Sequence, residues 1–261
     1  MNNRDLILIT NDDGYNAKGL KVLHDVAKTL SNNIWSFAPL SNNSGKSHSI
    51  TINKKIKTQV LKKQIYKVDG TPVDCVIIGV KYLSMKKMKP NIILSGVNHG
   101  QNLGLDLLYS GTVAAAREGS LHDIKSFSIS LEKNKGPSHW NTVKYYLPKI
   151  LERIKSLNLK SNIYFNINFP NVEIKKVKGC KIVKAGKRKP GELLKLSKMN
   201  KIFFIYMIPS ERKIHNSASM NEDEYEMKNK FITITYHSNL DIYEKTLSKK
   251  LFNSVRKIVE K

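Results

Sequence analysis

Short apolar segments of strand length alternate along this chain with segments of helical periodicity. Residues 6–10 (LILIT) have the composition of a buried strand, and apolar residues at helical spacing follow between Gly19 and Leu30. The same alternation continues, with strands expected at 34–38, 91–96 and 127–131 and helices at 72–83 and 112–118. Strands that alternate with helices favour a doubly wound, mostly parallel α/β sheet, in which ligands bind beyond the carboxyl ends of the strands.

The second half of the chain has weaker patterns. Helices are expected at 141–157 and 241–259, and strands at 163–169, 202–208 and 231–236. Lysine-alternating residues from Ile50 to Val68 predict exposed strands. The charged segment from Glu211 to Lys230 is expected to form an exposed hairpin arm. No repeat or linker divides the sequence, so residues 1–261 are expected to form one domain.

The composition is that of a globular protein. Of the 261 residues, 40% are hydrophobic and 25% are charged. The apolar runs are far shorter than the roughly 18 to 20 residues of a membrane span, and residues 6–10 are too few for a signal-peptide core. Cys75 and Cys180 form no CxxC pair, which argues against a disulfide framework or a zinc site. We therefore expect a soluble, cytoplasmic protein with no membrane partner.

The formal net charge of +24 raises the question of a nucleic-acid partner. Most of the 45 basic residues are lysines, and arginine occurs only at positions 4, 117, 153, 188, 212 and 256. Arginine reads phosphates and base edges with paired hydrogen bonds, whereas lysine is mostly a solvated point charge. Because the lysines are also spread along the whole chain, nucleic acid is not expected to be the main partner. An anionic small substrate would be attracted by the same charge.

Asp12 and Asp13 directly follow the first apolar strand. Two adjacent carboxylates repel each other unless a cation lies close to them, and hard oxygen ligands suit Mg²⁺, Mn²⁺ or Ca²⁺. The sequence Asn11-Asp12-Asp13-Gly14 is equally an ordinary turn. The pair by itself leaves both interpretations open, a metal site and a turn.

The polar loop 41–48 follows the second strand and contains Ser44 and His48. Its Gly-Lys-Ser sequence does not make a phosphate loop, because that motif requires glycine where this chain has Leu40. The loop still brings polar groups to the end of a strand, where Ser44 can complete a metal shell. A plain solvated loop is the alternative interpretation.

The glycine-rich loop 97–111 is the third polar segment that follows a strand. Asn98 offers a neutral oxygen ligand, and the glycines favour backbone that approaches a ligand or adopts a positive φ. Ser110 or Thr112 can cap the next helix, whose first N–H groups attract a phosphate. Simple capping of that helix is the alternative.

Taken together, these segments resemble motifs of the SurE (survival protein E) nucleotidases. The resemblance is carried by residues 9–14 (ITNDDG), 38–51 (APLSNNSGKSHSIT), 70–75 (GTPVDC), 95–104 (SGVNHGQNLG) and 109–119 (YSGTVAAAREG). It is dense over residues 5–131, within a motif-rich core of residues 1–131, and thins afterwards. Residues 166–170 (NINFP) still resemble an Asn-x-Asn-x-Pro segment, and 222–223 and 231–235 echo later motifs with several replacements.

The resemblance implies a Rossmann-like α/β fold of the SurE type with a C-terminal β-hairpin arm. It implies a divalent-metal-dependent phosphatase for nucleoside 5′- and 3′-monophosphates, in some members with exopolyphosphatase activity. It places the ligands of one divalent cation per subunit, Mg²⁺ or Mn²⁺, on Asp12, Asp13, Ser44 and Asn98. It further implies a homodimer or homotetramer with an exchanged arm, here at about residues 200–236.

Hydrolysis of a phosphomonoester requires positioning, charge neutralisation and an activated water. We expect Asp12, Asp13 and Asn98 to be the catalytic groups around the cation. The residues expected around the phosphate are Asn11, Gly45, His48, Ser110, Gly111 and Thr112. Asp13 or His48 is expected to move protons, and in a rival mechanism Asp12 forms an aspartyl phosphate. A non-catalytic nucleotide sensor and a basic nucleic-acid-binding protein remain alternative functions.

Overall fold

The computed structural model describes residues 5–157, 162–193, 195–199, 204–209, 212 and 219–239. These residues contain a nine-stranded sheet in the order β3-β4-β2-β1-β5-β6-β7-β11-β8. Its parallel centre comprises β4 (Ile65–Val68), β2 (Asn33–Pro39), β1 (Leu6–Thr10), β5 (Ile92–His99), β6 (Lys125–Leu131) and β7 (Ile163–Phe169). At the edges, β3 (Thr58–Lys62) and β11 (Ile232–Ser238) pair antiparallel with β4 and β7, and β8 (Cys180–Ile182) pairs with β11. The predicted mostly parallel α/β fold is confirmed.

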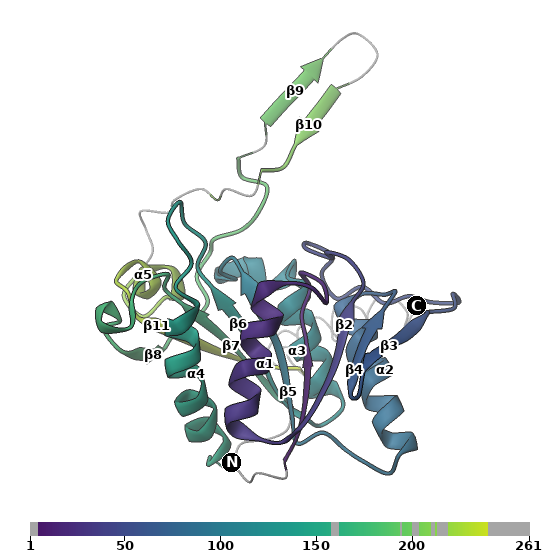
Figure 1. Ribbon diagram of the computed structural model, residues 1–261. Helices are drawn as coiled ribbons and strands as arrows, with labels where there is room; N and C mark the ends of the chain where they lie inside the picture. The colour runs from purple at the N-terminus through teal and green to yellow at the C-terminus, as the bar shows by residue number, and fades with distance from the viewer. Residues whose placement is uncertain are drawn as a thin grey trace, which may run out of the picture.

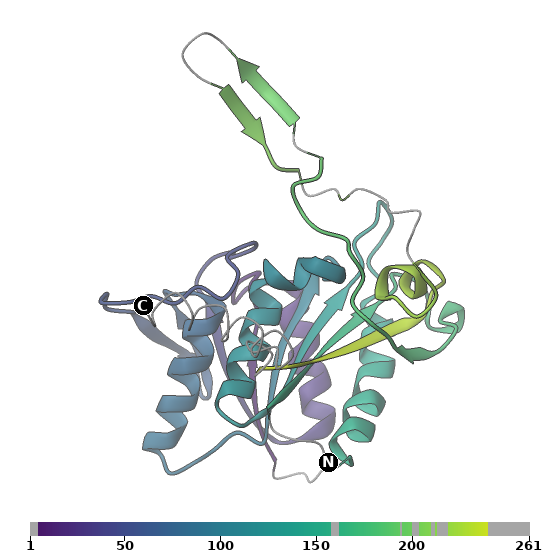
Figure 2. The same cartoon turned by 180° about the vertical axis from the view of Figure 1, so that it is seen from behind.

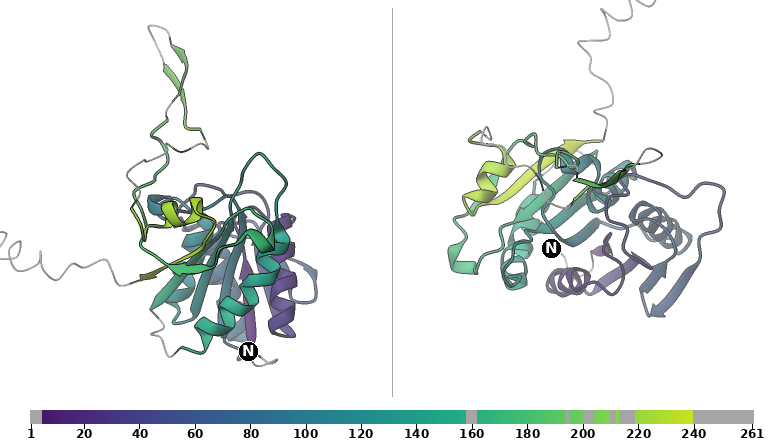
Figure 3. Two further views of the ribbon diagram at one scale, coloured as in Figure 1. Left: turned by 90° about the vertical axis from the view of Figure 1, so that its left-hand side faces the viewer. Right: turned by 90° about the horizontal axis from the view of Figure 1, so that it is seen from above.

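Helices cover both faces of the sheet (Figures 1 and 2). One face carries α1 (Lys18–Leu30) and α4 (Trp140–Lys155), and the other carries α2 (Pro72–Met85) and α3 (Gly111–Leu121). The sheet lies between these two helical layers, as the two views in Figure 3 show. Alternate residues of β1 point into the two cores, Ile7 and Ile9 into one and Leu6 and Leu8 into the other. This explains why β1 has an unbroken apolar sequence. Among the described helices, none has both the length and the apolar character needed to cross a membrane.

The site is positioned by the reversal of strand order at β1. The chain runs from β1 outward to β2 and β4, and then returns to the opposite side of β1 as β5. Loops that leave neighbouring strands in opposite directions open a crevice at the carboxyl edge of a sheet. α1 packs tightly against one wall of this crevice, since a Cβ at Gly19 would lie 1.8 Å from the carbonyl oxygen of Val97. The loops after β1, β2 and β5 therefore meet at this edge.

The expected strand at 50–52 is absent from the described structure, which shows no strand between β2 and β3. Thr51 instead donates from N and Oγ1 to the carboxylate of Asp74, at 3.0 and 2.7 Å. Asp74 is also the third residue of α2, where it forms a capping box with Thr71. Residues 50–52 are thus held across the N-terminus of α2, and within the stretch from Ile50 to Val68 the strands are β3 and β4.

A separate antiparallel hairpin, β9 (Lys195–Met199) and β10 (Phe204–Met207), projects from the carboxyl-end side of the main sheet (Figures 1 and 3). The hairpin arm is therefore confirmed, but it lies earlier in the chain than the charged segment 211–230 in which it was predicted. The described end of that segment forms α5 (Asp223–Lys228), whose Asp223 is buried. β11 likewise belongs to the main sheet and not to an arm reaching residue 236. The helix expected at 241–259 lies outside the described residues.

Candidate functional site

Asp12 is a buried anion at the carboxyl end of β1, with 3% of its surface exposed. Thr112, in the first turn of α3, donates from N and from Oγ1 to the two carboxylate oxygens, at 3.1 and 2.5 Å. Burial raises the pKa of Asp12 to about 6 against these hydrogen bonds, and the adjacent Asp13 carboxylate adds to the rise. A cation close to Asp12 would stabilise its charged form.

The groups next to Asp12 contribute further oxygen atoms. Asp13 accepts a hydrogen bond from the backbone N–H of His99 at 3.3 Å, and burial raises its pKa as well. The side-chain nitrogen of Asn98 donates to the carbonyl of Gly100 at 2.6 Å, so this contact does not use its amide oxygen. Ser44 is exposed in the loop after β2, where its N–H donates to the side chain of Asn42 at 2.8 Å. Three strand ends thus supply two carboxylates, a hydroxyl and an amide.

A pocket of about 730 Å³ brings these groups together. Six of the predicted site residues line it, namely Asp12, Asp13, Ser44, Gly45, Asn98 and Ser110. Four cationic side chains line the same pocket, those of Lys133, Lys135, Arg188 and Arg212. Three other hollows in the described structure, of about 480, 390 and 410 Å³, are smaller, and none of them gathers two carboxylates.

The other four predicted residues are not among those that line the pocket. The side-chain nitrogen of Asn11 donates to the carbonyl of Gly14 at 2.8 Å and so shapes the turn after β1. Thr112 uses both of its donors to hold Asp12. Gly111 packs beneath the same carboxylate, where a Cβ would lie 3.0 Å from that of Asp12. His48 binds Glu118 instead, with 2.9 Å between Nε2 and Oε2.

The donor set fits a hard divalent cation. In the described part of the chain, no three side chains of the His, Cys, Asp or Glu type come together as a metal cluster. The pocket instead combines the carboxylates of Asp12 and Asp13 with the neutral oxygens of Ser44 and Asn98. Such all-oxygen sets suit Mg²⁺ or Mn²⁺, whereas zinc prefers nitrogen and sulfur ligands.

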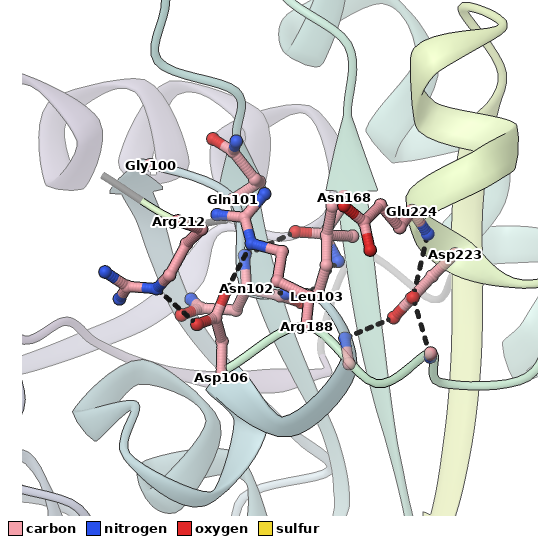
Figure 4. A network of polar contacts seen from close by, with 12 residues as sticks. Gly100, Gln101, Asn102, Leu103, Asp106, Asn168, Arg188, Arg212, Asp223 and Glu224 are labelled. Carbon is pink, nitrogen blue, oxygen red and sulfur yellow. Dashed lines mark hydrogen bonds and ion pairs between the residues drawn. The ribbon is translucent and has the colours of Figure 1, made fainter. Parts of the chain in front are cut away.

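Arg188 and Arg212 are pocket residues that sequence reasoning missed. Both form ion pairs with the buried Asp106, whose carboxylate lies 3.0 Å from Nε of Arg188 and 2.8 Å from Nε of Arg212 (Figure 4). The available signal was their residue type, because arginine is rare in this lysine-rich chain. Where lysine serves for general charge, arginine marks positions that need its planar, weakly hydrated head group.

The pocket loop 97–111 is held in place by residues far away in the sequence. Asp223 accepts hydrogen bonds from the backbone N–H groups of Gly104 and Gly186, at 2.8 and 2.9 Å (Figure 4). Asn166 and Asn168 on β7 both donate to the carbonyl of Asn102 at 3.0 Å, and Asn168 accepts from its N–H at 2.8 Å. The Asn-x-Asn segment therefore fixes the backbone of the loop that carries Asn98 and Ser110.

Comparison with known proteins agrees with this geometry. The family model described as "Survival protein SurE" matches residues 7–192. A protein of Paramagnetospirillum magneticum named 5′-nucleotidase SurE is 42% identical over 187 residues, which cover 71% of this chain and 72% of the relative. The protein of that name from Nitrobacter winogradskyi is 40% identical over 190 residues, covering 72% and 74%. The chain belongs to the SurE family.

A solved SurE structure supports the same assignment. The SurE protein from Aquifex aeolicus superimposes with a TM-score of 0.84 at 28% sequence identity, over 96% of this chain and 99% of that one. The family resemblance drawn from the motifs is thereby confirmed, and so is the SurE-type fold. The family match ends at residue 192, before β9, so the hairpin and α5 lie beyond the segment that the family model covers.

Replacing Asp223 should loosen the pocket loop. Asp223→Asn removes the charge and leaves one acceptor oxygen for the buried N–H groups of Gly104 and Gly186, so the free energy of unfolding should fall by about 1–3 kcal/mol. Urea unfolding measures the loss. The control is Glu224→Gln, which changes the neighbouring, partly exposed carboxylate. Equal stability of the two variants would contradict this role of Asp223.

The contribution of Glu118 to the stability of the fold should decrease as the pH falls in the acid range. Burial alone would raise its pKa, but hydrogen bonds from His122 and His48, together with their charges, lower it to about 2 from the ordinary 4.5. A carboxyl whose pKa is lower in the folded state stabilises the fold above its unfolded pKa, and loses this effect as pH falls through the folded value. The stability difference between the wild type and Glu118→Gln should therefore shrink between pH 4.5 and 2, as measured by urea unfolding. A constant difference over this range would disprove the assignment.

Proposed function

We propose that this chain, a 5′-nucleotidase by family, hydrolyses nucleoside 5′-monophosphates with the help of a divalent cation, and accepts nucleoside 3′-monophosphates and short polyphosphate as further substrates. The observation that carries the proposal is the pocket itself. Two adjacent carboxylates, Asp12 and Asp13, share it with four cationic side chains. Such a pocket suits a bound metal ion beside a bound phosphate, because the carboxylates attract the metal ion and the cationic side chains attract the phosphate.

The residues that fit the cation are Asp12, Asp13, Ser44 and Asn98. When bound there, Mg²⁺ or Mn²⁺ supplies Lewis-acid charge to a phosphate oxygen and lowers the pKa of a water molecule. Thr112 keeps the Asp12 carboxylate in place through two hydrogen bonds, so the ligand is oriented before any metal arrives. Both Asp12 oxygens retain a lone pair for a cation after accepting from Thr112.

The phosphate group is assigned to the space between Ser110, Gly45 and the cationic side chains. Ser110 caps α3 by accepting from the N–H of Val113 at 3.2 Å, so the positive end of this helix faces the pocket. Gly45 has a φ of 74° and no atom within 4 Å of where its Cβ would lie, which leaves its backbone open to a ligand. Lys133 and Arg188 also line the pocket and add positive charge, and the carboxylate of Asp106, which pairs with Arg188, lines it too.

Proton transfer is assigned to Asp13. His48, the other candidate, binds Glu118 through Nε2 and is not a lining residue of the pocket. Asp13 does line the pocket and is less enclosed than Asp12. Its carboxylate is therefore the group that we expect to accept a proton from the attacking water.

Phosphate release should require both the metal and Asp13. Asp13→Asn should lower kcat by at least about a hundredfold for nucleoside 5′-monophosphates, because it removes a metal ligand and the proton acceptor. The assay compares Mg²⁺, Mn²⁺ and EDTA on nucleoside 5′- and 3′-monophosphates and short polyphosphate. Asp25→Asn is the control, since Asp25 is an exposed carboxylate on α1. Binding of nucleotide by folded wild type without any release would instead make the chain a sensor.

We further propose that the chain assembles with itself through the β9–β10 hairpin. The hairpin projects from the main sheet (Figure 1). The two strands of the hairpin and the residue after β10 expose large apolar side chains, those of Leu196, Ile205, Tyr206, Met207 and Ile208. Exposed apolar side chains gathered on a projecting hairpin are a typical interaction surface. A second copy of the chain, as a dimer or a tetramer, is the partner that we expect.

Charge on the hairpin should reduce the molecular mass in solution. Ile205→Asp combined with Tyr206→Ser should shift the particle toward the monomer, because an interface that buries these side chains would then hold an unpaired charge. Light scattering after size-exclusion chromatography measures the mass. Val60→Asp provides the control, since Val60 is exposed on β3, away from the hairpin. An unchanged mass of the hairpin variant would exclude this surface as the interface.

A further inference from the structure

We infer that the ring of Tyr109 is the platform on which the base of a nucleotide substrate stacks; this inference rests on the proposed function. Tyr109 lines the same pocket as Asp12, Asp13 and Ser110. It is 47% exposed, so part of this large aromatic side chain is accessible to a ligand in the pocket. Flat aromatic surfaces left open beside a phosphate site are suited to bases, since every base has a π face.

The backbone of Tyr109 is fixed on both sides. Its N–H donates to the carbonyl of Asp106 at 3.0 Å, within the turn that ends the short helix η1 (Gly104–Leu108). Its carbonyl accepts from the N–H of Ser47 at 3.0 Å, and the hydroxyl of Ser47 donates to the carbonyl of Leu108 at 2.5 Å. Tyr109 therefore joins the loop after β2 to the loop after β5. The ring is presented from a rigid main chain, which keeps the entropic cost of stacking low.

The ring itself has no partner within the described residues: no hydrogen bond, ring contact or cation–π contact involves it. His99 is the other lining residue with an aromatic ring. Its Nε2 lies 2.9 Å from the hydroxyl of Ser138, and its ring lies 5.3 Å from that of Trp140. His99 is thus already engaged, whereas Tyr109 is exposed and makes no such contact among the described residues.

Tyr109 lies next in the chain to the proposed phosphate position, so it is placed to meet the base of the same nucleotide. Ser110, the next residue, caps α3 at the place assigned to the phosphate, and Thr112 holds Asp12 from the same turn. We expect a nucleotide whose phosphate binds there to place its base against the ring of the neighbouring residue, Tyr109. Stacking reads little of the base identity, so the pocket should accept all common bases, with purines favoured for their larger surface.

The experiment compares AMP with ribose 5-phosphate, which has the same sugar and phosphate but no base. Wild type should prefer AMP in kcat/KM, and Tyr109→Ala should lower that preference by about fivefold to a hundredfold, mainly through KM. Tyr109→Phe should keep the preference, because the ring and not the hydroxyl makes the contact. Tyr145→Ala is the matched control, since Tyr145 is also 47% exposed but lies on α4, outside the pocket.

A binding measurement separates this inference from the proposed activity. Dissociation constants for AMP and ribose 5-phosphate are measured by calorimetry in EDTA, where turnover is not expected. Tighter binding of AMP that is lost in Tyr109→Ala and kept in Tyr109→Phe would support the platform even if the wild type released no phosphate. The inference would be overturned if Tyr109→Ala weakened the binding of both ligands equally. It would also be overturned if Tyr109→Ala kept the preference for AMP.

Discussion

The burial of the Asp12 carboxylate at the carboxyl end of β1 is the constraint on which the site depends. A buried anion is costly unless hydrogen bonds and a nearby cation stabilise it. Thr112 provides the hydrogen bonds, and in doing so ties the first turn of α3 to the end of β1. The backbone of Asp12 also accepts from the N–H of Asn43 at 2.7 Å, which draws in the loop after β2. One residue thus organises three loops around the proposed metal position.

The second half of the chain contributes to the pocket by holding the loop after β5. Asp223 and the Asn166–Asn168 pair bind backbone groups of that loop, and Asp106 pairs with Arg188 and Arg212. Arg188 lies in the segment that leads to the hairpin, and Arg212 follows the hairpin. The pocket and the root of the arm are therefore connected by charged contacts.

The positive charge of the chain bears on the proposed function mainly where cationic side chains line the pocket. A net charge of +24 spread along the chain attracts anions in general. Salt at about 0.1 M largely screens this attraction at distances beyond about 10 Å. Four cationic side chains line the same pocket as Asp12 and Asp13, an arrangement that suits the proposed phosphate next to a metal. Tyr109 adds an aromatic surface to the same pocket, which by our inference distinguishes a nucleotide from a simple sugar phosphate.

The sequence alone determined the parallel α/β core, because strands buried on both faces have continuous apolar runs and alternate with helices of clear period. It also indicated Asp12, Asp13, Ser44 and Asn98, since each follows a strand and the carboxyl ends of parallel strands meet at one edge. Only the tertiary structure showed that Thr112 donates hydrogen bonds to Asp12 and that His48 contacts Glu118. It also showed that Arg188 and Arg212 line the pocket. It also showed that the hairpin arm is formed by β9 and β10, and that α5 packs against β11 of the main sheet. The contacts of His48, Thr112 and Arg212 join residues 70 to 106 positions apart, which local periodicity and turn chemistry do not encode.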